Sequence, residues 1–444
     1  MKKIEFLGLV FLGILFFVWP VAHTVTARDL LLVLNLALFG YLAWHQGWPR
    51  EVLRGLSVPI VILVALTLWM HVVVFFISPE TAWSLGEIQS QWWRALAALL
   101  AGALAALAAR ESPSLRRNML LVLFAVLVAH MLHVDVQTAN SWMKSGAWDR
   151  AAGLTEGPDK SNYLSNMLFG FLLAALFYRG VYGKRTPAFH PVILAIAWAL
   201  AAIAVLGERT RNGIVTLMLM LLASGALYLL MQKDRLKKAA LFAAVGAMLL
   251  IAIGGLALVT TLRQSPGMDN LIGTIPIAWD TEHYKGWQDE KKYGLPVLPN
   301  GETVDASLYM RVAWFKQGLL LICDHPLGIG FGRNAYGHGM KAKYGEGAGH
   351  SHSGMLDFAI GTGVPGALLW LGFFVSLAVP AYRRIRAAPN YAAALLFFLL
   401  LDFGARMFLD SIIRDHMLQQ FLFLTGFAAV MMVTEGPGKR KPSA

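Results

Sequence analysis

The sequence is poor in cysteine and in charge. Cys323 is the only cysteine among 444 residues, so the chain can form no internal disulfide, no cysteine-based metal site and no redox pair. We expect its thiol to be packed. Charged residues make up 14% of the chain and hydrophobic residues 57%, whereas a soluble domain has about 25% charged residues. This composition excludes an ordinary soluble protein and indicates an integral membrane protein.

Long apolar runs take the place of the missing charge. A helix needs about 20 apolar residues to cross a hydrocarbon core roughly 30 Å thick, and twelve such windows are present. We therefore predict an all-α integral membrane protein with about twelve transmembrane helices. The predicted spans are residues 4–20, 29–44, 56–77, 93–109, 118–134, 163–178, 190–206, 213–231, 239–260, 356–381, 391–409 and 416–434.

The connections between these spans alternate in charge. Lys and Arg accumulate in cytoplasmic loops, and alternate connections here hold 20 of the 38 Lys and Arg but only five of the 26 acids. We expect this basic side to be cytoplasmic, with both termini there, because no small-residue cleavage site follows the first span. The net charge of +12 reflects this topology, and its spread over seven short segments argues against a nucleic-acid partner.

The polar residues outside the spans are concentrated on the side opposite the predicted cytoplasmic side, in two long connections at roughly 135–162 and 261–355. The second contains apolar residues at helical spacing, namely Leu308, Val312, Phe315, Leu319 and Ile322. Asp305 is placed to cap this helix, which is too short to span and is expected at the membrane surface. We therefore predict transmembrane helices 1–9 in residues 1–260, a periplasmic loop domain with short surface helices in 261–355, helices 10–12 in 356–434, and a cytoplasmic tail in 435–444.

Arginines stand at membrane level on this polar side. The connection GERTRNG, residues 207–213, holds Arg209 and Arg211 beside Glu208. One interpretation is interfacial snorkelling with a Glu208 salt bridge. The other is an anion site, since the planar guanidinium fork suits phosphate oxygens and stays charged. Arg311, on the expected surface helix, and Arg333, after the glycine-rich stretch GIGFG, are further candidates for the same site.

Histidines cluster before the tenth predicted span, where GHSHSGMLD holds His350 and His352, with His338 upstream. An H-x-H pair can ligate a metal with His338 or Glu346 completing the shell, or the histidines can be hydrogen-bonded structural residues. The third interpretation is general base catalysis, for which imidazole has a pKa near the working pH.

The last polar connection, DFGARMFLDSIIRDH, holds Arg406 and Asp410 four residues apart. They can pair on one helix face, or Asp410 can orient an arginine or a catalytic histidine. Taken together, permanent cations and a nearby base fit transfer of a group from a lipid diphosphate. The arginines would stabilise the charge that builds on the leaving group, and no metal or other cofactor is then required.

The motifs resemble one family. HPLGIGFGRNAYG at 325–337, GHSHSGMLDFAIGTGVPGALLWLG at 349–372 and the long loop before them are similar to the bacterial O-antigen ligases, which are related to O-antigen polymerases and protein O-oligosaccharyltransferases. The resemblance implies a multi-pass protein of the bacterial inner membrane. It also implies transfer of a glycan from undecaprenyl diphosphate to an acceptor on the periplasmic face, the acceptor of the ligases being lipid A-core.

The resemblance also assigns residues. The family's two histidines fall on His350 and His352, although Ser353 stands where its H-x-H-N pattern has Asn, and His338 remains an alternative base. The family's basic turn corresponds to Thr210–Gly213, which contains Arg211, and its loop-helix arginine corresponds to Arg311, with Trp314 nearby.

Three other functions compete with a ligase. An O-antigen polymerase shares the same pattern. A transporter or flippase for lipid-linked sugars also has many spans, but its polar residues would be concentrated at the membrane midplane, whereas here they are concentrated in a loop of about ninety residues. A purely structural membrane subunit would leave the clustered arginines unexplained.

Overall fold

The computed structural model describes residues 2–47, 49–146, 149–183, 188–231, 268–345 and 349–435. These residues form helices and irregular connections with no β-strand, apart from one isolated bridge between Val297 and Thr303. The helices are α1 (Lys2–Val18), α2 (Val25–Gln46), α3 (Arg50–Gly55), α4 (Ser57–Phe76), α5 (Thr81–Glu87), the π-helix η1 (Ile88–Trp92), α6 (Trp93–Ala108), α7 (Pro113–Ser145), α8 (Pro158–Tyr182), α9 (Pro191–Glu208), α10 (Arg211–Met231), α12 (Met268–Trp279), α13 (Glu290–Tyr293), α14 (Ala306–Asp324), α15 (Ala335–Tyr344), α16 (Gly354–Ala387), α17 (Tyr391–Leu409) and α18 (Asp415–Thr434).

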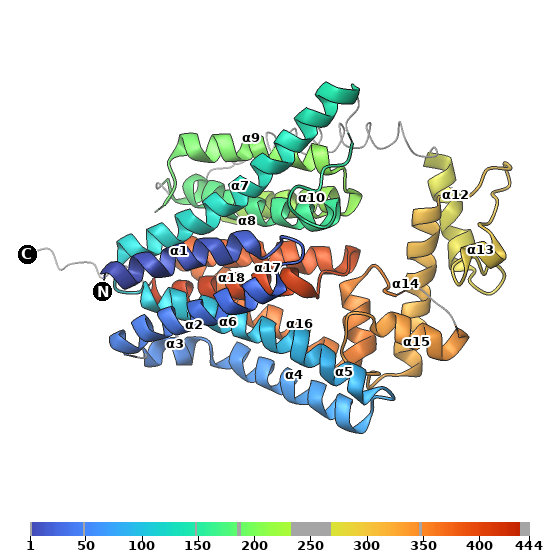
Figure 1. Cartoon of the computed structure of the whole chain (residues 1–444), viewed down its shortest axis with the longest axis horizontal. Helices are drawn as coiled ribbons and strands as arrows, with labels where there is room; N and C mark the ends of the chain where they lie inside the picture. The colour runs from blue at the N-terminus through green and yellow to red at the C-terminus, as the bar shows by residue number, and fades with distance from the viewer. Residues whose placement is uncertain are drawn as a thin grey trace, which may run out of the picture.

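Ten of the described helical segments are long and apolar enough to cross a membrane, which confirms an all-α integral membrane protein. They lie side by side in one bundle (Figure 1). Each matches one of the twelve predicted spans, and the predicted span 4–20 coincides with α1, which has 17 residues. The predicted span 239–260 lies outside the described residues.

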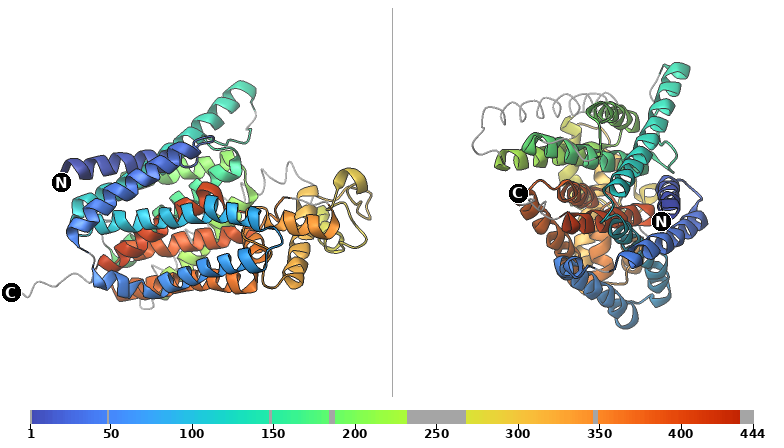
Figure 2. Two further views of the ribbon diagram at one scale, coloured as in Figure 1. Left: turned by 60° about the horizontal axis from the view of Figure 1, so that its bottom comes forward. Right: turned by 90° about the vertical axis from the view of Figure 1, so that its left-hand side faces the viewer.

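Helix α18 forms the centre of the bundle, although it comes last in the chain. It is the most deeply buried of the ten segments, and Figure 2 shows it in red in the middle of the bundle. Its Gly426 packs against α6, where a Cβ would lie 2.3 Å from the Leu99 carbonyl oxygen. Small residues allow such close backbone approach, which strengthens helix packing in a membrane.

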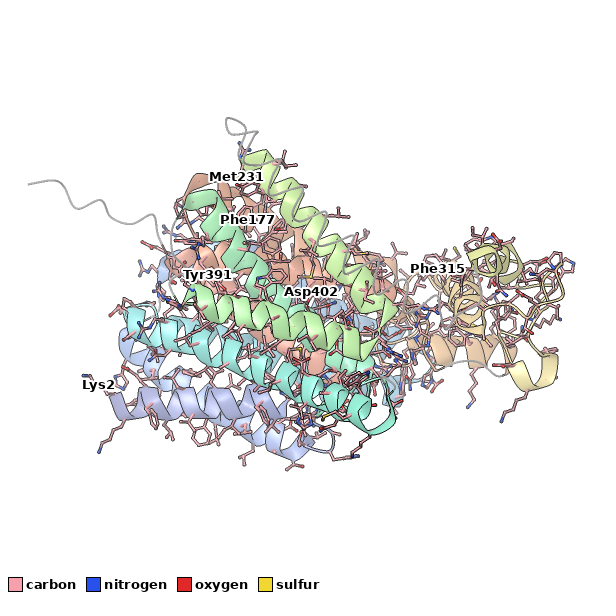
Figure 3. The ribbon with its side chains drawn as sticks, turned by 90° about the horizontal axis from the view of Figure 1, so that it is seen from above. Lys2, Phe177, Met231, Phe315, Tyr391 and Asp402 are labelled. Carbon is pink, nitrogen blue, oxygen red and sulfur yellow. The ribbon has the colours of Figure 1, made fainter. Side chains whose placement is uncertain are left out.

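Helices α12 to α15 gather at one end of the bundle, which we call the loop-domain end (Figure 1). Asp305 caps α14 as predicted, since its carboxylate accepts a hydrogen bond from the Leu308 amide at 2.7 Å. Helix α14 lies across the end of the bundle rather than along it. Figure 3 shows Phe315 of α14 in this cluster and Asp402 of α17 inside the bundle.

The predicted apolar face of α14 is divided between the core of the loop-domain end, on which Val312 and Ile322 pack, and the outer surface. Tyr309, Ala313 and Leu321 form the packed stripe of the helix against the small core of the loop-domain end. Phe315 and Leu319 from the predicted face are each 40% exposed. The prediction that Cys323 is packed is wrong, because this residue is exposed. Two positions along a helix turn about 200°, so Cys323 lies opposite the buried Leu321.

The first long polar connection is shorter than predicted. Helix α7 continues past the predicted end at residue 134 to Ser145, and α8 begins at Pro158. The connection is therefore residues 146–157.

Helix α16 is broken at Gly363, which has φ 69° and ψ 179°. Pro365 has no N–H to donate back to Gly361, and the Val364 amide donates instead to the Pro326 carbonyl at 2.8 Å. The freed carbonyls of α16 find other donors. Ile360 and Gly361 accept from the amides of Ile329 and Gly330 at 3.1 and 2.9 Å, and Thr362 accepts from the Trp69 indole at 2.7 Å.

The glycine-rich stretch therefore serves packing. Its amides at residues 329 and 330 are already bonded to α16, so they are not available to an anion. This docking fixes the first half of α16, and with it the histidine segment that precedes α16, against the loop-domain end.

Replacing Gly363 by Ala tests the break. We expect the variant to lose more than about 2 kcal/mol of stability, because this backbone region is essentially restricted to glycine and the added Cβ would lie 2.3 Å from the Leu327 carbonyl carbon. The midpoint of thermal unfolding of the detergent-purified protein should fall accordingly. Gly225→Ala in α10 is the matched control, since nothing lies within 4 Å of its added Cβ. An equal midpoint for both variants would contradict the packing role.

Candidate functional site

The turn between α9 and α10 is built around a buried carboxylate. Glu208 is fully buried and accepts hydrogen bonds from Ser161 at 2.6 Å, Asn162 at 2.7 Å and Ser165 at 2.8 Å. One interpretation of the sequence is a salt bridge between Glu208 and the neighbouring arginines. In the structure, hydroxyl and amide donors of α8 hold the Glu208 carboxylate. Burying a carboxylate is costly unless it is hydrogen-bonded in this way.

The two arginines of this turn differ in their surroundings. Arg209 ends α9 in the left-handed region, with φ 49°. Arg211 begins α10, and its side chain is 45% exposed, with Nη1 3.9 Å from the Asp305 carboxylate that caps α14. Arg211 therefore lies where the membrane bundle meets the loop-domain end.

Arg406, in the last turn of α17, is a buried charge that faces the start of α8. Its side chain has no exposure to solvent. Its guanidinium donates to the Asn162 side-chain oxygen and to the Asp159 carbonyl oxygen, both at 2.7 Å, and to Asp410 at 3.4 Å. The predicted pairing of Arg406 with Asp410 is thus present. Asn162 joins Glu208 to Arg406, so one network links α8, α9 and α17.

Arg311 projects from α14 onto the bundle. Its Nη1 donates to the Asn212 side-chain oxygen at 2.8 Å, and the Asn212 amide donates to the Leu409 carbonyl at 2.8 Å. Asn212 therefore fixes the Arg311 guanidinium over the start of α10 and the end of α17. Arg211 and Arg311 consequently approach the same corner from two different elements.

The two histidines of the GHSHS segment lie at this corner. The centroids of their rings are 4.4 Å apart. His352 has the left-handed φ of 56°, and its ring stacks on Trp314 of α14 with centroids 5.4 Å apart and planes within 9°. Trp314 is itself held by its indole N–H, which donates to the Trp287 carbonyl at 3.0 Å. Both the backbone conformation and the stacking therefore fix the imidazole of His352.

Asp357 joins the histidine segment to the last connection of the bundle. Its buried carboxylate accepts from the Ser351 amide at 3.0 Å and from the Ser411 hydroxyl at 2.6 Å. Beside this contact, the Gly354 amide donates to the Asp410 carbonyl at 3.0 Å. The segment that holds both histidines and the segment that holds Asp410 are thereby held together.

Burial and cations keep both imidazoles neutral. Burial, together with the neighbouring His352 and Arg414, lowers the pKa of His350 to about 4. Burial and the Arg311 guanidinium lower the pKa of His352, while the Asp410 carboxylate raises it. Both rings are then neutral near pH 7 and keep an unprotonated nitrogen that can accept a proton.

Arg333 is held by acids rather than left open. Its guanidinium and its backbone amide donate to Glu87 at 2.8 to 3.2 Å, and Nη1 donates to Asp415 at 3.2 Å. It lines a small crevice that Asp357 and Arg414 also line. Because two carboxylates compensate its charge, Arg333 is better placed to fix this crevice than to bind a diphosphate.

His338 lies apart from the other two histidines. Its Nδ1 is 2.8 Å from Glu80 and its ring stacks on Trp83 with centroids 3.9 Å apart. The structure therefore groups His350 and His352 with Arg311, Arg414 and Asp410. It places Arg211 beside Asp305 and His338 among residues of the 80–83 segment.

The sequence did not single out Asn212, Asp357 or Arg414. All three lie in stretches quoted under Sequence analysis, namely the basic turn, the histidine segment and the last polar connection, but no role was assigned to them there. Glu346, the other candidate metal ligand, lies outside the described residues. Within the described ranges, no group of three or more His, Cys, Asp or Glu side chains is placed to hold a metal ion.

Comparison with known families identifies the segment that contains this site. Residues 196–371 match a family model described as O-antigen ligase. The match begins in α9 and ends in α16, so it includes the arginine turn, Arg311 and both histidines. It confirms the resemblance drawn from the motifs and indicates a membrane enzyme of the glycosyltransferase type. A search of curated proteins finds no match to the chain.

Proposed function

Because residues 196–371 match the O-antigen ligase family, we propose that the chain moves an O-antigen glycan from undecaprenyl diphosphate to lipid A-core. The reaction takes place at the loop-domain end of the bundle, which faces the periplasm, in the bacterial inner membrane. One observation carries the proposal: Arg311 is held near a neutral, fixed imidazole by Asn212, the residue that follows Arg211 at the start of α10.

The reaction is a substitution at the anomeric carbon of the donor sugar. An acceptor hydroxyl forms the new C–O bond while the bond from the sugar to the diphosphate breaks. The electron pair of that bond leaves with undecaprenyl diphosphate, and the hydroxyl proton passes to a histidine. His352 is the better base because Trp314 and its own backbone hold its ring in place.

The arginines take the electrostatic role. Arg311 and Arg211 bind the diphosphate and stabilise the negative charge that grows on it as it leaves, and Arg209 and Arg414 add positive potential nearby. Guanidinium groups placed before the reaction stabilise such charge without needing to reorganise. Asp410 holds Arg406 and raises the pKa of His352, so it balances the cations around the base.

Alanine substitutions test these assignments. In His352→Ala, Arg311→Ala and Arg211→Ala, we expect transfer to fall by about a hundredfold or more, since a general base or a charge-stabilising donor contributes at least that much. The purified protein is reconstituted in lipid with undecaprenyl diphosphate-linked glycan, lipid A-core and EDTA. Transfer is read as a mobility shift of the lipid A-core.

The matched controls come from the loop-domain end. His283→Ala replaces an exposed histidine paired with Asp280, and Lys291→Ala replaces an exposed cation of α13; both should transfer normally. Normal transfer by all three site variants would refute the site. Elongation of the donor glycan without a shift of lipid A-core would identify a polymerase, and no reaction of either kind would favour a transporter.

The pH dependence tests the base. If His352 accepts the proton, activity falls as the pH falls through its pKa, which lies below the ordinary value of 6.5. Asp410→Asn removes an anion that raises this pKa, so the acid limb should move to lower pH. Arg311→Gln removes a cation that lowers it, so the limb should move to higher pH in a slower enzyme. Measuring kcat/KM from pH 4.5 to 8 gives the acid limb of each variant for comparison with the wild type. Shifts in the same direction would exclude His352 as the titrating base.

A further inference from the structure

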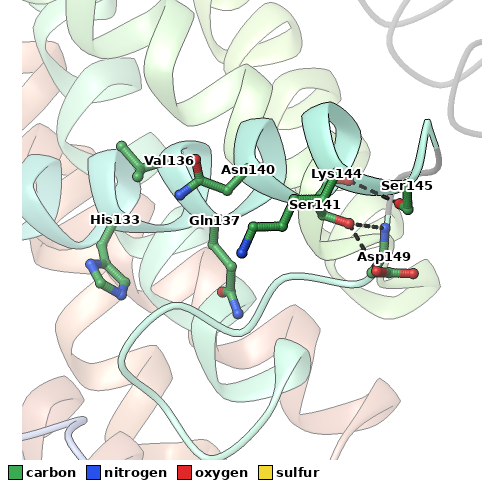
Figure 4. Close-up of a pocket in the computed structure, with 8 residues that line it drawn as sticks. All are labelled: His133, Val136, Gln137, Asn140, Ser141, Lys144, Ser145 and Asp149. Carbon is green, nitrogen blue, oxygen red and sulfur yellow. Dashed lines mark hydrogen bonds between the residues drawn. The ribbon is translucent and has the colours of Figure 1, made fainter.

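A polar groove lies along the end of α7, away from the arginines and histidines. It has a volume of about 420 Å³, and its lining includes His133, Gln137, Asn140, Lys144 and Asp149 (Figure 4). The first four come from one face of α7, and Asp149 comes from the connection that follows.

The groove is at the level of lipid head groups. Helix α7 has 33 residues and is therefore about 50 Å long, whereas the hydrocarbon core is roughly 30 Å thick. Leu132 and Val136, at the start of the groove, are 51% and 49% exposed, as expected for side chains that face lipid. Trp142, further along, is 56% exposed, and tryptophan is enriched at the membrane–water interface. A ligand in the groove would therefore lie among head groups of the outer leaflet.

One wall of the groove is built by specific hydrogen bonds. The Gln137 side-chain oxygen accepts from the amides of Ala152 and Gly153 at 3.1 and 2.9 Å. The Ser141 hydroxyl donates to the Asp149 carboxylate at 2.8 Å. These bonds hold the connection alongside α7 and occupy the groove's one carboxylate.

Other polar groups of the groove remain available to a ligand. The side chains of His133, Asn140 and Lys144 form no hydrogen bond or ion pair with any described residue, and the same holds for the amide nitrogen of Gln137. An amide donates and accepts at once, which suits neighbouring sugar hydroxyls, and a lysine ammonium suits a phosphate. Together they fit a phosphorylated sugar better than an apolar chain.

The groove shares its wall with the site. Next to Asp149, the Arg150 guanidinium donates to the Glu208 carbonyl at 3.4 Å, and the Ala151 amide donates to the Gly207 carbonyl at 3.0 Å. Further along, the Asp159 carbonyl accepts from Arg406. One connection therefore runs from the groove to the turn that holds Arg209 and Arg211.

We propose that this groove binds the sugar–phosphate head group of the acceptor glycolipid. This inference rests on the proposed function, because it names the place where the second substrate docks. The donor diphosphate is bound at Arg211 and Arg311, so the two substrates approach the histidines from different sides. The acceptor keeps its acyl chains in the outer leaflet beside Leu132 and Val136 while its sugars extend toward the site.

The double variant Asn140→Ala/Lys144→Ala tests the groove. Both side chains are exposed, so the fold should persist, as a single size-exclusion peak would verify. We expect KM for lipid A-core to rise about tenfold, while KM for the donor and kcat stay within about twofold. Arg117→Ala/Asn118→Ala, at the other end of the same helix, is the matched control and should leave both KM values unchanged.

A binding measurement separates this inference from the proposed function. Radiolabelled lipid A-core is bound to His352→Ala protein in nanodiscs, with and without the double variant, and the measurement is repeated with enzymatically dephosphorylated lipid A-core. About tenfold weaker binding in the double variant supports the groove even if the wild type elongates the donor instead. A smaller effect with the dephosphorylated lipid would assign Lys144 to the phosphate. Equal binding by both proteins, or an equal rise of both KM values, would overturn the inference.

Discussion

The structure depends on one requirement: the buried guanidinium of Arg406, the buried carboxylate of Glu208 and the freed carbonyls of α16 all need partners inside the protein. Arg406 shows this most clearly, because its guanidinium is completely buried and the cost of burying it is offset only by hydrogen bonds and an acid. Asn162 also donates to the buried carboxylate of Glu208, which accepts from Ser161 and Ser165 as well. The network fixes the ends of α8, α9 and α17 relative to one another. The arginine turn and Asp410 therefore occupy defined positions before any substrate arrives.

The same requirement places the histidines. Pro365 and Gly363 break α16 and free carbonyls that must be paired inside the protein. The stretch before α15 supplies the amides at residues 329 and 330, and Trp69 of α4 supplies its indole. A motif rich in glycine thus attaches the loop-domain end to the bundle. Asp357, on the half-helix held in this way, then clamps the histidine segment to the connection that follows α17.

The cations and the base influence one another at this corner. Arg311 lies near enough to His352 to lower its pKa, and Asp410 opposes that effect. The proposed site needs positive charge to bind a diphosphate and a base that avoids protonation, and the Arg311 guanidinium would serve both needs. The stacked Trp314 adds a fixed wall that keeps the imidazole from turning away. The proposed site is therefore assembled from four elements, namely α10, α14, the segment before α16 and the end of α17.

The sequence by itself determined the membrane class, the places of the spans among the described residues and the residue types of the proposed site, because apolar length, charge bias and motif spacing are local properties of the chain. The cap at Asp305 and the pairing of Arg406 with Asp410 were predictable for the same reason, since both join residues within one turn of a helix. Only the tertiary structure decided which face of α14 is buried, which histidines meet the arginines, and that Asn212, Asp357 and Arg414 belong to the site. Those choices depend on contacts between residues up to about two hundred positions apart, such as Asn212 with Leu409. Local periodicity carries no information about such contacts.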